Sequence, residues 1–309
     1  MTPLRAKFIR DLTVRGRAQR TQKSYLHHVS ELARYYRRSP ELLSYEEVTD
    51  WLYHLVKERQ LSASSVNVAA NAVRFLYGIT LGRDTEKLMR SVPRLKHPTR
   101  RAEVYARSEV EAILSVPSQP RDRAFLMTVY ACGLRVCEAR DLKISDIDRA
   151  RMQLRVRKGK GAKERVLPLS KRLLKELGDY WRAQRQGKAG HDNPLLFLGQ
   201  IADKPISLTS AGKIYNRAVQ KSGVQRKGGI HVLRHSFATH LIESGVELPV
   251  VQRLMGHSNL RTTALYLHVT ECRLAEFVRL WISSIRVTSS PSSARREREK
   301  KLPPGQSAP

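Results

Sequence analysis

Apolar side chains recur at helical spacing along the first 90 residues. A helix turns every 3.6 residues, so positions i, i+3, i+4 and i+7 share one face. Four stretches follow this rule, and we expect them to form a small helical bundle with the stripes as its core. The apolar positions are Leu4, Phe8, Ile9 and Leu12; Tyr25, Leu26, Val29, Leu32, Ala33 and Tyr36; Val48, Trp51, Leu52, Leu55 and Val56; and Val66, Ala69, Ala70, Val73, Leu76 and Tyr77.

Helix starts are marked by short polar patterns. Ser44, followed three positions later by Glu47, is a capping box, in which each side chain bonds the backbone N–H of the other residue. Ser108 with Glu111 is a second such pair, and Thr21 is a candidate cap for the second helix. We therefore expect a new helix to open at Ser108, after a break in the pattern.

That break is a basic stretch interrupted by Pro93 and Pro98, which reads as an interdomain linker. The end of the chain is rich in Ser, Pro and charged residues, a composition typical of disorder. The expected organisation is a helical domain, a linker, a second domain and a basic disordered tail, at residues 1–90, 91–101, 102–285 and 286–309.

The second domain has a mixed pattern. Helical runs surround residues 125–130 and 173–181, and helix returns from Ile230. Between them, "MQLRVRKGKGAKERVLPLS" alternates apolar and polar positions on both sides of a Gly-rich turn. That alternation predicts a β-hairpin with a basic tip. The expected fold class is mainly α with a small β-sheet.

The charge of the chain indicates its partner. Lys and Arg number 57 against 28 Asp and Glu, a net charge of +29. The surplus is spread out, with +9 in residues 1–98, +16 in residues 99–285 and +4 in residues 286–309. A surface this positive favours a polyanion, and nucleic acid before anionic lipid.

The cysteines indicate a compartment. Cys132, Cys137 and Cys272 form neither a C-x-x-C pair nor an even set, which is typical of the reducing cytoplasm. The first residues lack the apolar core of a signal peptide, and no run of about 18 apolar residues predicts a membrane span. We expect a cytoplasmic protein with no membrane segment.

Candidate chemistry begins with "GGIHVLRHSFATHL", where His231, Arg234, His235 and His240 crowd together. His231 and His235 have the i, i+4 spacing of a zinc site, but Arg234 lies between them and no acidic residue or cysteine stands nearby. His231 and Arg234 share a helical face, and a guanidinium fork with an imidazole suits a phosphodiester. A basic helix facing DNA would show the same pattern.

Four further residues have ordinary explanations when taken singly. Arg135 follows Gly133 and could be a cation at a helix C-terminus. Lys160, between two glycines, could be a solvated turn residue with Lys163 as its rival; His257 and Tyr266 could fill a turn and a core. Their order along the chain, together with His231 and Arg234, is more specific than any of them alone.

In that order the chain resembles the tyrosine recombinase (phage integrase) family, Xer-like or mobile-element integrases included. "GLRVCE", "GKGAKERVLPL", "HVLRHSFATHL" and "LMGHSNLRTTALYLH" each match the family's usual wording. The resemblance implies two domains, a helical SAM-like core-binding domain and a mixed α+β catalytic domain. Two features depart from related patterns. Ala139 follows Glu138 where the family usually has Leu, and residues 169–231 are too short for the insertion of integron integrases.

The resemblance also implies a reaction. Tyr266 would attack a DNA phosphodiester, leaving a 3′-phosphotyrosyl intermediate, and a strand of the partner duplex would then replace it. Arg135 and Arg234 would bind the phosphate, and three further side chains would assist: Lys160, His231 and His257. Lys160 would protonate the leaving oxygen, His231 would act as a base towards the tyrosine, and Glu138 would orient Arg135 or His231.

The implied partners are double-stranded DNA recombination sites, with a homotetramer on two synapsed sites for integration, excision or resolution of DNA elements. No cofactor and no metal is expected. After Tyr266, an apolar stripe that includes Leu274, Phe277 and Trp281 would dock on a neighbouring protomer or pack on its own domain. Two alternatives remain open, a type IB topoisomerase-like enzyme and a non-catalytic DNA-binding regulator.

Overall fold

The structure is a computed structural model that describes residues 2–84, 86–87, 90, 92, 94–96, 103–157, 164–186, 192–201 and 203–256. Its contacts divide the chain into two compact units, Met1–Arg100 and Arg101–Pro309, which we call unit 1 and unit 2. Within the described residues, no helical segment combines the length and the apolar character of a membrane span.

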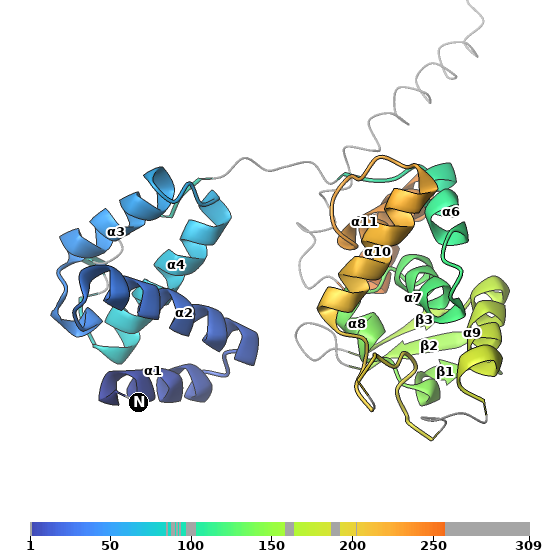
Figure 1. The fold of residues 1–309 in the computed structure, drawn as a ribbon, viewed down its shortest axis with the longest axis horizontal. Helices are drawn as coiled ribbons and strands as arrows, with labels where there is room; N and C mark the ends of the chain where they lie inside the picture. The colour runs from blue at the N-terminus through green and yellow to red at the C-terminus, as the bar shows by residue number, and fades with distance from the viewer. Residues whose placement is uncertain are drawn as a thin grey trace, which may run out of the picture. The chain divides into compact units, whose positions relative to one another are not determined.

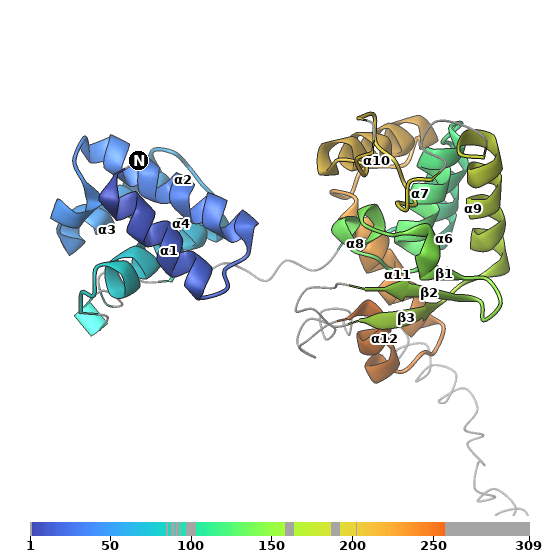
Figure 2. The same cartoon turned by 90° about the horizontal axis from the view of Figure 1, so that it is seen from below.

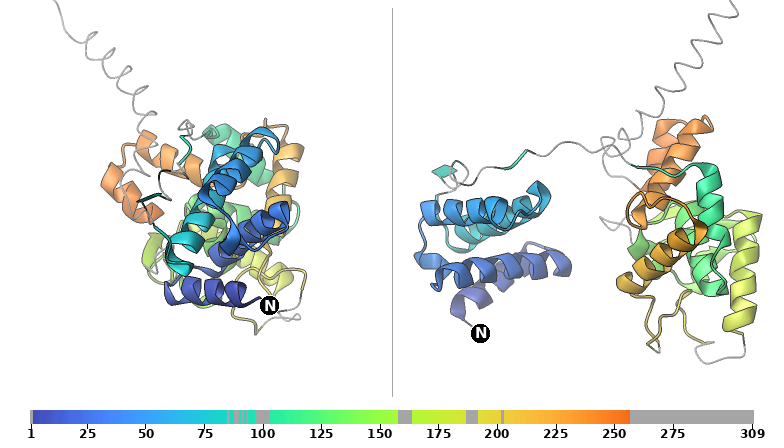
Figure 3. Two further views of the ribbon diagram at one scale, coloured as in Figure 1. Left: turned by 90° about the vertical axis from the view of Figure 1, so that its left-hand side faces the viewer. Right: turned by 45° about the horizontal axis from the view of Figure 1, so that its top comes forward.

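Unit 1 is built of helices that pack side by side (Figures 1 and 3). Its elements are α1 (Pro3–Val14), α2 (Gln19–Tyr36), the 3-10 turn η1 (Pro40–Leu42), α3 (Tyr45–Lys57), α4 (Ala63–Phe75) and the π-turn η2 (Leu76–Thr80). The expected stripes form its core, with Phe8, Leu32, Trp51 and Val73 each at most 1% exposed. The prediction of a helical bundle is confirmed.

The start of α3 is the predicted capping box. The Glu47 N–H donates to Ser44 Oγ at 3.1 Å, and the Ser44 N–H donates to Glu47 Oε2 at 2.7 Å. The prediction for Thr21 is wrong, because α2 already begins at Gln19 with Ala18 at the N-cap position. A side-chain cap is thus used at α3 and not at α2.

Part of the stretch expected to be a linker packs against unit 1. Val92 is fully buried, and Leu95 lies against the same core. The Asn67 amide holds Leu95 from both sides, donating to its carbonyl at 3.0 Å and accepting from its N–H at 2.9 Å. Residues 97–102 lie outside the described part of the chain.

Unit 2 combines helices with a small sheet, one face of which packs on the core (Figure 2). Its helical elements are α6 (Arg107–Ser115), α7 (Pro120–Ala131), α8 (Val136–Arg140), the 3-10 turn η3 (Ile144–Asp146), α9 (Lys171–Gln184), α10 (Leu208–Ser222), α11 (His231–Glu243) and α12 (Leu248–Met255). Helices α7 and α9 pack along each other, and α12 lies beside the last strand.

The sheet is antiparallel, with strand order β1 (Ile147–Asp148), β2 (Gln153–Val156) and β3 (Arg165–Pro168). Arg155 pairs with Val166 in the register of β2 and β3, so the predicted hairpin is present, although its tip lies outside the described residues. Leu154 and Leu167 face the core, whereas Val166 is exposed. The prediction of a mainly helical chain with a small sheet is confirmed.

The start of α6 differs from the predicted capping box at Ser108 and Glu111. The helix begins at Arg107, and Glu109 accepts the Ala106 N–H at 2.7 Å. Glu109 also accepts a hydrogen bond from Lys227 Nζ at 2.6 Å. The predicted start of the helix was therefore two positions too late. Lys227, which binds Glu109, is remote in the chain and leaves no local signal in the sequence.

Candidate active site

Arg135 is placed by a tight turn between α7 and α8. Gly133 adopts a left-handed conformation with φ +54°, and a Cβ there would lie 2.3 Å from Cδ1 of Phe237. Only glycine combines this backbone angle with so close an approach. The turn sets Arg135 at the N-cap position of α8.

His231 and Arg234 lie on the first turn of α11, on one helical face as expected. The Arg234 side chain is 5% exposed and its guanidinium donates to the carbonyls of Gly133 and Met255. His231 is exposed at the start of the helix. A helix that is mostly buried thus carries an accessible histidine at its first position and a buried arginine three positions later.

Glu138 joins these elements. Its Oε1 accepts from Arg135 Nη1 at 2.8 Å, and its Oε2 accepts from the Arg135 N–H at 2.9 Å. Arg234 Nη1 lies 3.7 Å from the same Oε2. The two arginines expected to bind phosphate thus meet at one carboxylate that is 3% exposed. Of the two roles considered for Glu138, the structure supports orientation of Arg135.

Electrostatics fix the charge states at this junction. Burial alone would raise the pKa of Glu138, but the hydrogen bonds and charge of Arg165, and then those of Arg135, hold it at about 2. The pKa of His231 is lowered, first by loss of hydration around the ring and then by the positive charges of Arg234 and Arg135. At neutral pH Glu138 is ionised and His231 is biased towards its neutral form.

The end of α12 closes the site from another side. Gly256 is left-handed at φ +62° and ends the helix, and its carbonyl accepts from Arg135 Nη2 at 3.3 Å. A Cβ at Gly256 would lie 2.9 Å from Arg165 Nη1, the end of a side chain, so the left-handed backbone angle is what favours glycine here. Gly256 therefore lies next to Arg135 and Arg165.

Arg165 also contacts the site, although it was not among the residues predicted from the sequence. It lies on β3 and donates to both oxygens of Glu138, at 3.0 and 2.7 Å. A signal was available, because Arg165 shares the parity of Leu167 and Leu169 in the alternating strand and so falls on the core face. A charged residue on a core face needs a partner.

The structure brings together Arg135, His231 and Arg234. The remaining expected site residues, Lys160, His257 and Tyr266, lie outside the described part of the chain, as does Lys163. Their roles stay predictions. The described residues form the half of the site that would hold the phosphate.

The two other histidines of α11 have different surroundings. His240 Nε2 donates to the Tyr105 carbonyl at 2.9 Å, and its Nδ1 lies 2.9 Å from the Tyr130 hydroxyl. Both partners are remote in the sequence, so tertiary hydrogen bonds account for His240. His235 is partly buried, and burial lowers the pKa of its ring.

A possible metal-ligand trio among the described residues lies elsewhere, in unit 1. His27, His28 and Glu31 offer atoms within 4.8 Å of one another on α2. Glu31 Oε2 lies 3.3 Å from His27 Nε2 and 3.4 Å from His28 Nδ1, so side-chain neighbours one turn apart on one helix account for the arrangement.

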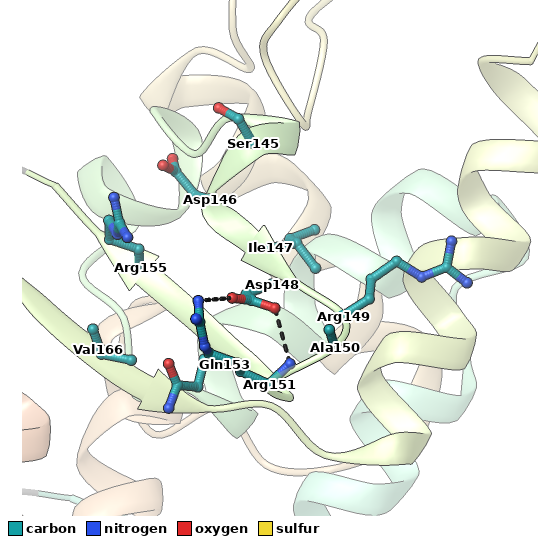
Figure 4. A pocket seen from close by; sticks show the side chains of 10 residues that line it. All are labelled: Ser145, Asp146, Ile147, Asp148, Arg149, Ala150, Arg151, Gln153, Arg155 and Val166. Atoms are coloured by element: carbon teal, nitrogen blue, oxygen red, sulfur yellow. Dashed lines mark hydrogen bonds and ion pairs between the residues drawn. The ribbon is translucent and has the colours of Figure 1, made fainter.

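A polar hollow of about 460 Å³ lies on the solvent face of the sheet (Figure 4). Asp148 and Arg151 pair across it, with Nη1 3.2 Å from Oδ2. Arg149 and Arg155 also line the hollow. Because Arg165 and Leu167 point to the opposite face, this hollow is separate from the junction at Glu138.

Comparisons with known proteins agree with this geometry. The phage integrase family model matches residues 103–287, and the model of the phage integrase N-terminal SAM-like domain matches residues 4–87. The Sinorhizobium fredii protein y4qK, which carries the provisional name integrase/recombinase, is 38% identical over 269 residues, covering 87% of this chain and 85% of its own. Tyrosine recombinase XerA of Thermococcus kodakarensis is 35% identical over 262 residues, covering 84% and 88%.

Solved structures share the fold. The Tn1549 transposon integrase, solved with circular intermediate DNA, aligns with a TM-score of 0.65 at 16% identity, covering 89% of this chain and 99% of that one. The XerH site-specific recombinase, solved with its difH substrate after cleavage, gives 0.61 at 23% identity, covering 79% and 74%. The family models together extend over both units of the chain. The chain belongs to the phage integrase family of tyrosine site-specific recombinases.

Proposed function

We propose that the chain recombines DNA through a 3′-phosphotyrosyl intermediate with Tyr266 as the nucleophile and without a metal. The observation that carries the proposal is the meeting of Arg135 and Arg234 at Glu138, beside His231. Two guanidinium groups held in advance stabilise the negative charge that develops on the nonbridging oxygens. They supply the positive charge that a divalent metal supplies in other phosphoryl-transfer sites.

His231 fits the role of a base towards Tyr266, because its lowered pKa leaves the ring able to accept a proton at neutral pH. A phenol has a pKa of about 10 and needs such help. His257, directly after Gly256, would hydrogen-bond the phosphate. Each of these roles uses a side chain of this protein and no cofactor.

Lys160 is the proposed general acid for the leaving 5′-oxygen, with Lys163 as the alternative. At a 5′-bridging phosphorothioate the leaving group is a 5′-thiolate, which needs no proton. This substrate therefore distinguishes Lys160 from Lys163 as the general acid. Cleavage by whichever variant lacks the acid, Lys160→Ala or Lys163→Ala, should recover on that substrate. Recovery by neither variant would remove both lysines from the role.

The proposed partners are double-stranded DNA recombination sites, bound by four protomers across two synapsed sites. Relatives named integrase/recombinase and tyrosine recombinase support a DNA site as the partner. The net charge of +29 supports contact with a polyanion by both units. A cytoplasmic location fits the unpaired cysteines.

Covalent trapping tests the proposal. The protein is expressed in cells, denatured rapidly, and the DNA that remains attached is sequenced; a nicked duplex is then built on the recovered sequence. Wild type should give a protease-sensitive adduct on this duplex in excess EDTA. Tyr266→Phe should bind the duplex and give none. An adduct with the Phe variant, or a strict requirement of cleavage for Mg²⁺, would refute the mechanism.

A type IB topoisomerase-like enzyme would also form the adduct, but it would rejoin the same strand. Two duplexes with different labels distinguish the reactions, because recombination produces molecules that carry both labels.

A further inference from the structure

Arg165 has every guanidinium nitrogen engaged within the protein. Its Nη1 and Nη2 donate to Glu138, and its Nε donates to the Leu254 carbonyl at 2.9 Å. The side chain is 8% exposed. It is therefore placed to hold other groups of the site and not to bind phosphate itself.

Glu138 is the first group that Arg165 holds. Each oxygen of this carboxylate is shared, because Oε1 also accepts from Arg135 Nη1 and Oε2 also accepts from the Arg135 N–H. An isolated carboxylate can rotate about its last bond. The two parallel bonds from Arg165 remove that freedom and so fix the acceptors that orient Arg135.

The C-terminal end of α12 is the second group. Three consecutive carbonyls accept hydrogen bonds from three arginines, Leu254 from Arg165, Met255 from Arg234 and Gly256 from Arg135. The C-terminal end of a helix carries partial negative charge, which favours cations there. Arg165 alone among the three also reaches this end from the sheet.

We infer that Arg165 is a positioning residue of the recombination site, which fixes Arg135 and Arg234 by holding Glu138 and the end of α12 in one hydrogen-bonded unit. The inference rests on the proposed function. Lysine at this position would keep the charge but lose the planar fork and the Nε contact with Leu254. Charge alone would then be insufficient for full activity.

The test is single-turnover cleavage of the nicked duplex, with three separate readouts: DNA affinity, the rate constant and the final amount of adduct. For Arg165→Gln we expect a rate constant lower by about 10- to 100-fold, the scale of a small misplacement of catalytic groups. DNA affinity and the final amount of adduct should stay close to wild type. The rate constant of Arg165→Lys should lie between those of wild type and Arg165→Gln.

Arg155→Gln is the matched control. It removes the same charge from the same sheet, but from the exposed face of β2. Its DNA affinity should change as little as that of Arg165→Gln, and its cleavage rate constant should equal that of wild type. The comparison separates lost charge from lost positioning.

The route through Glu138 is tested by a double-mutant cycle. If Arg165 and Glu138 act in one hydrogen-bonded unit, the loss of rate in Arg165→Gln combined with Glu138→Gln should be clearly smaller than the product of the two single losses. Losses that multiply would show that Arg165 acts by another route, and the inference would be wrong.

Two results for the single variants would also overturn it. One is a wild-type rate constant in Arg165→Gln. The other is a reduced final amount of adduct with an unchanged rate constant, which indicates partial unfolding. If Arg165→Gln does not fold, Arg165→Lys decides by the same criteria. Absence of any adduct with wild type would instead refute the proposed function and not this inference.

Discussion

At the scale of single residues, His231 shows how neighbouring charge prepares a base. Loss of hydration around the ring, and then the positive charges of Arg234 and Arg135, oppose its protonation, so its pKa is lowered from 6.5. Glu138 keeps its charge over the whole physiological range, because its pKa is about 2. Of this pair, His231 is therefore the group whose protonation can limit cleavage as the pH falls below 6.5.

We therefore predict the acidic limb of the cleavage rate. With DNA well below saturation, the profile reports groups of the unbound enzyme. A base must be neutral, so the rate should hold as the pH falls to 6.5 and decline below that value. His231→Gln should be about 100-fold slower with a flattened limb. A midpoint at or above pH 6.5 would contradict this assignment.

At the scale of elements, the turn between α7 and α8 supports the site. Gly133→Ala forces a methyl group onto Phe237 at 2.3 Å and places alanine at φ +54°. We expect a loss of about 1–3 kcal/mol in the free energy of unfolding and slower cleavage, because Arg135 follows within two residues. Thermal unfolding and the cleavage rate constant measure the two effects.

Gly212→Ala is the control for that variant. Gly212 lies inside α10 with nothing within 4 Å of its would-be Cβ. Alanine stabilises a helix interior by about 1 kcal/mol relative to glycine, so the midpoint of thermal unfolding of Gly212→Ala should rise. Equal midpoints for the two variants would show that the turn is not under the constraint described here.

Sequence patterns predicted elements whose evidence is local. The stripe through Trp51 and the capping box at Ser44 are set by neighbours within one helix, and both are present. The start of α6 was displaced, because Glu109 is held by Lys227 from a distant segment. Arg165 was missed for the same reason, since its partner Glu138 and its acceptor Leu254 come from separate elements.

At the scale of the whole molecule, the positive charge is spread over both units and the tail. Each contact with a phosphate releases counterions, so binding to a single DNA site should weaken steeply with salt. Assembly across two sites needs contacts between protomers in addition. The apolar stripe after Tyr266 is the proposed source of those contacts.

Two deletions test that source at equal charge. Residues 270–285 contain two basic and two acidic residues, so removal of residues 270–309 or of residues 286–309 takes away the same net charge of +4. Both variants should bind single sites alike. Only the longer deletion should abolish cooperative binding and recombination, measured by gel shift and by joining of labelled duplexes. Unfolding by the longer deletion would show that the stripe packs on its own domain.

The arginine contacts at the end of α12 also bear on when the site forms. The bond from Arg135 to Gly256 spans 121 positions in the chain, and that from Arg165 to Leu254 spans 89. Contacts this remote in sequence form late in folding, and a ribosome makes Arg135 well before α12. Unit 1 and Arg135 are thus synthesised well before the carbonyls of α12 that orient the arginines, so the capacity to cut depends on one of the later steps of folding.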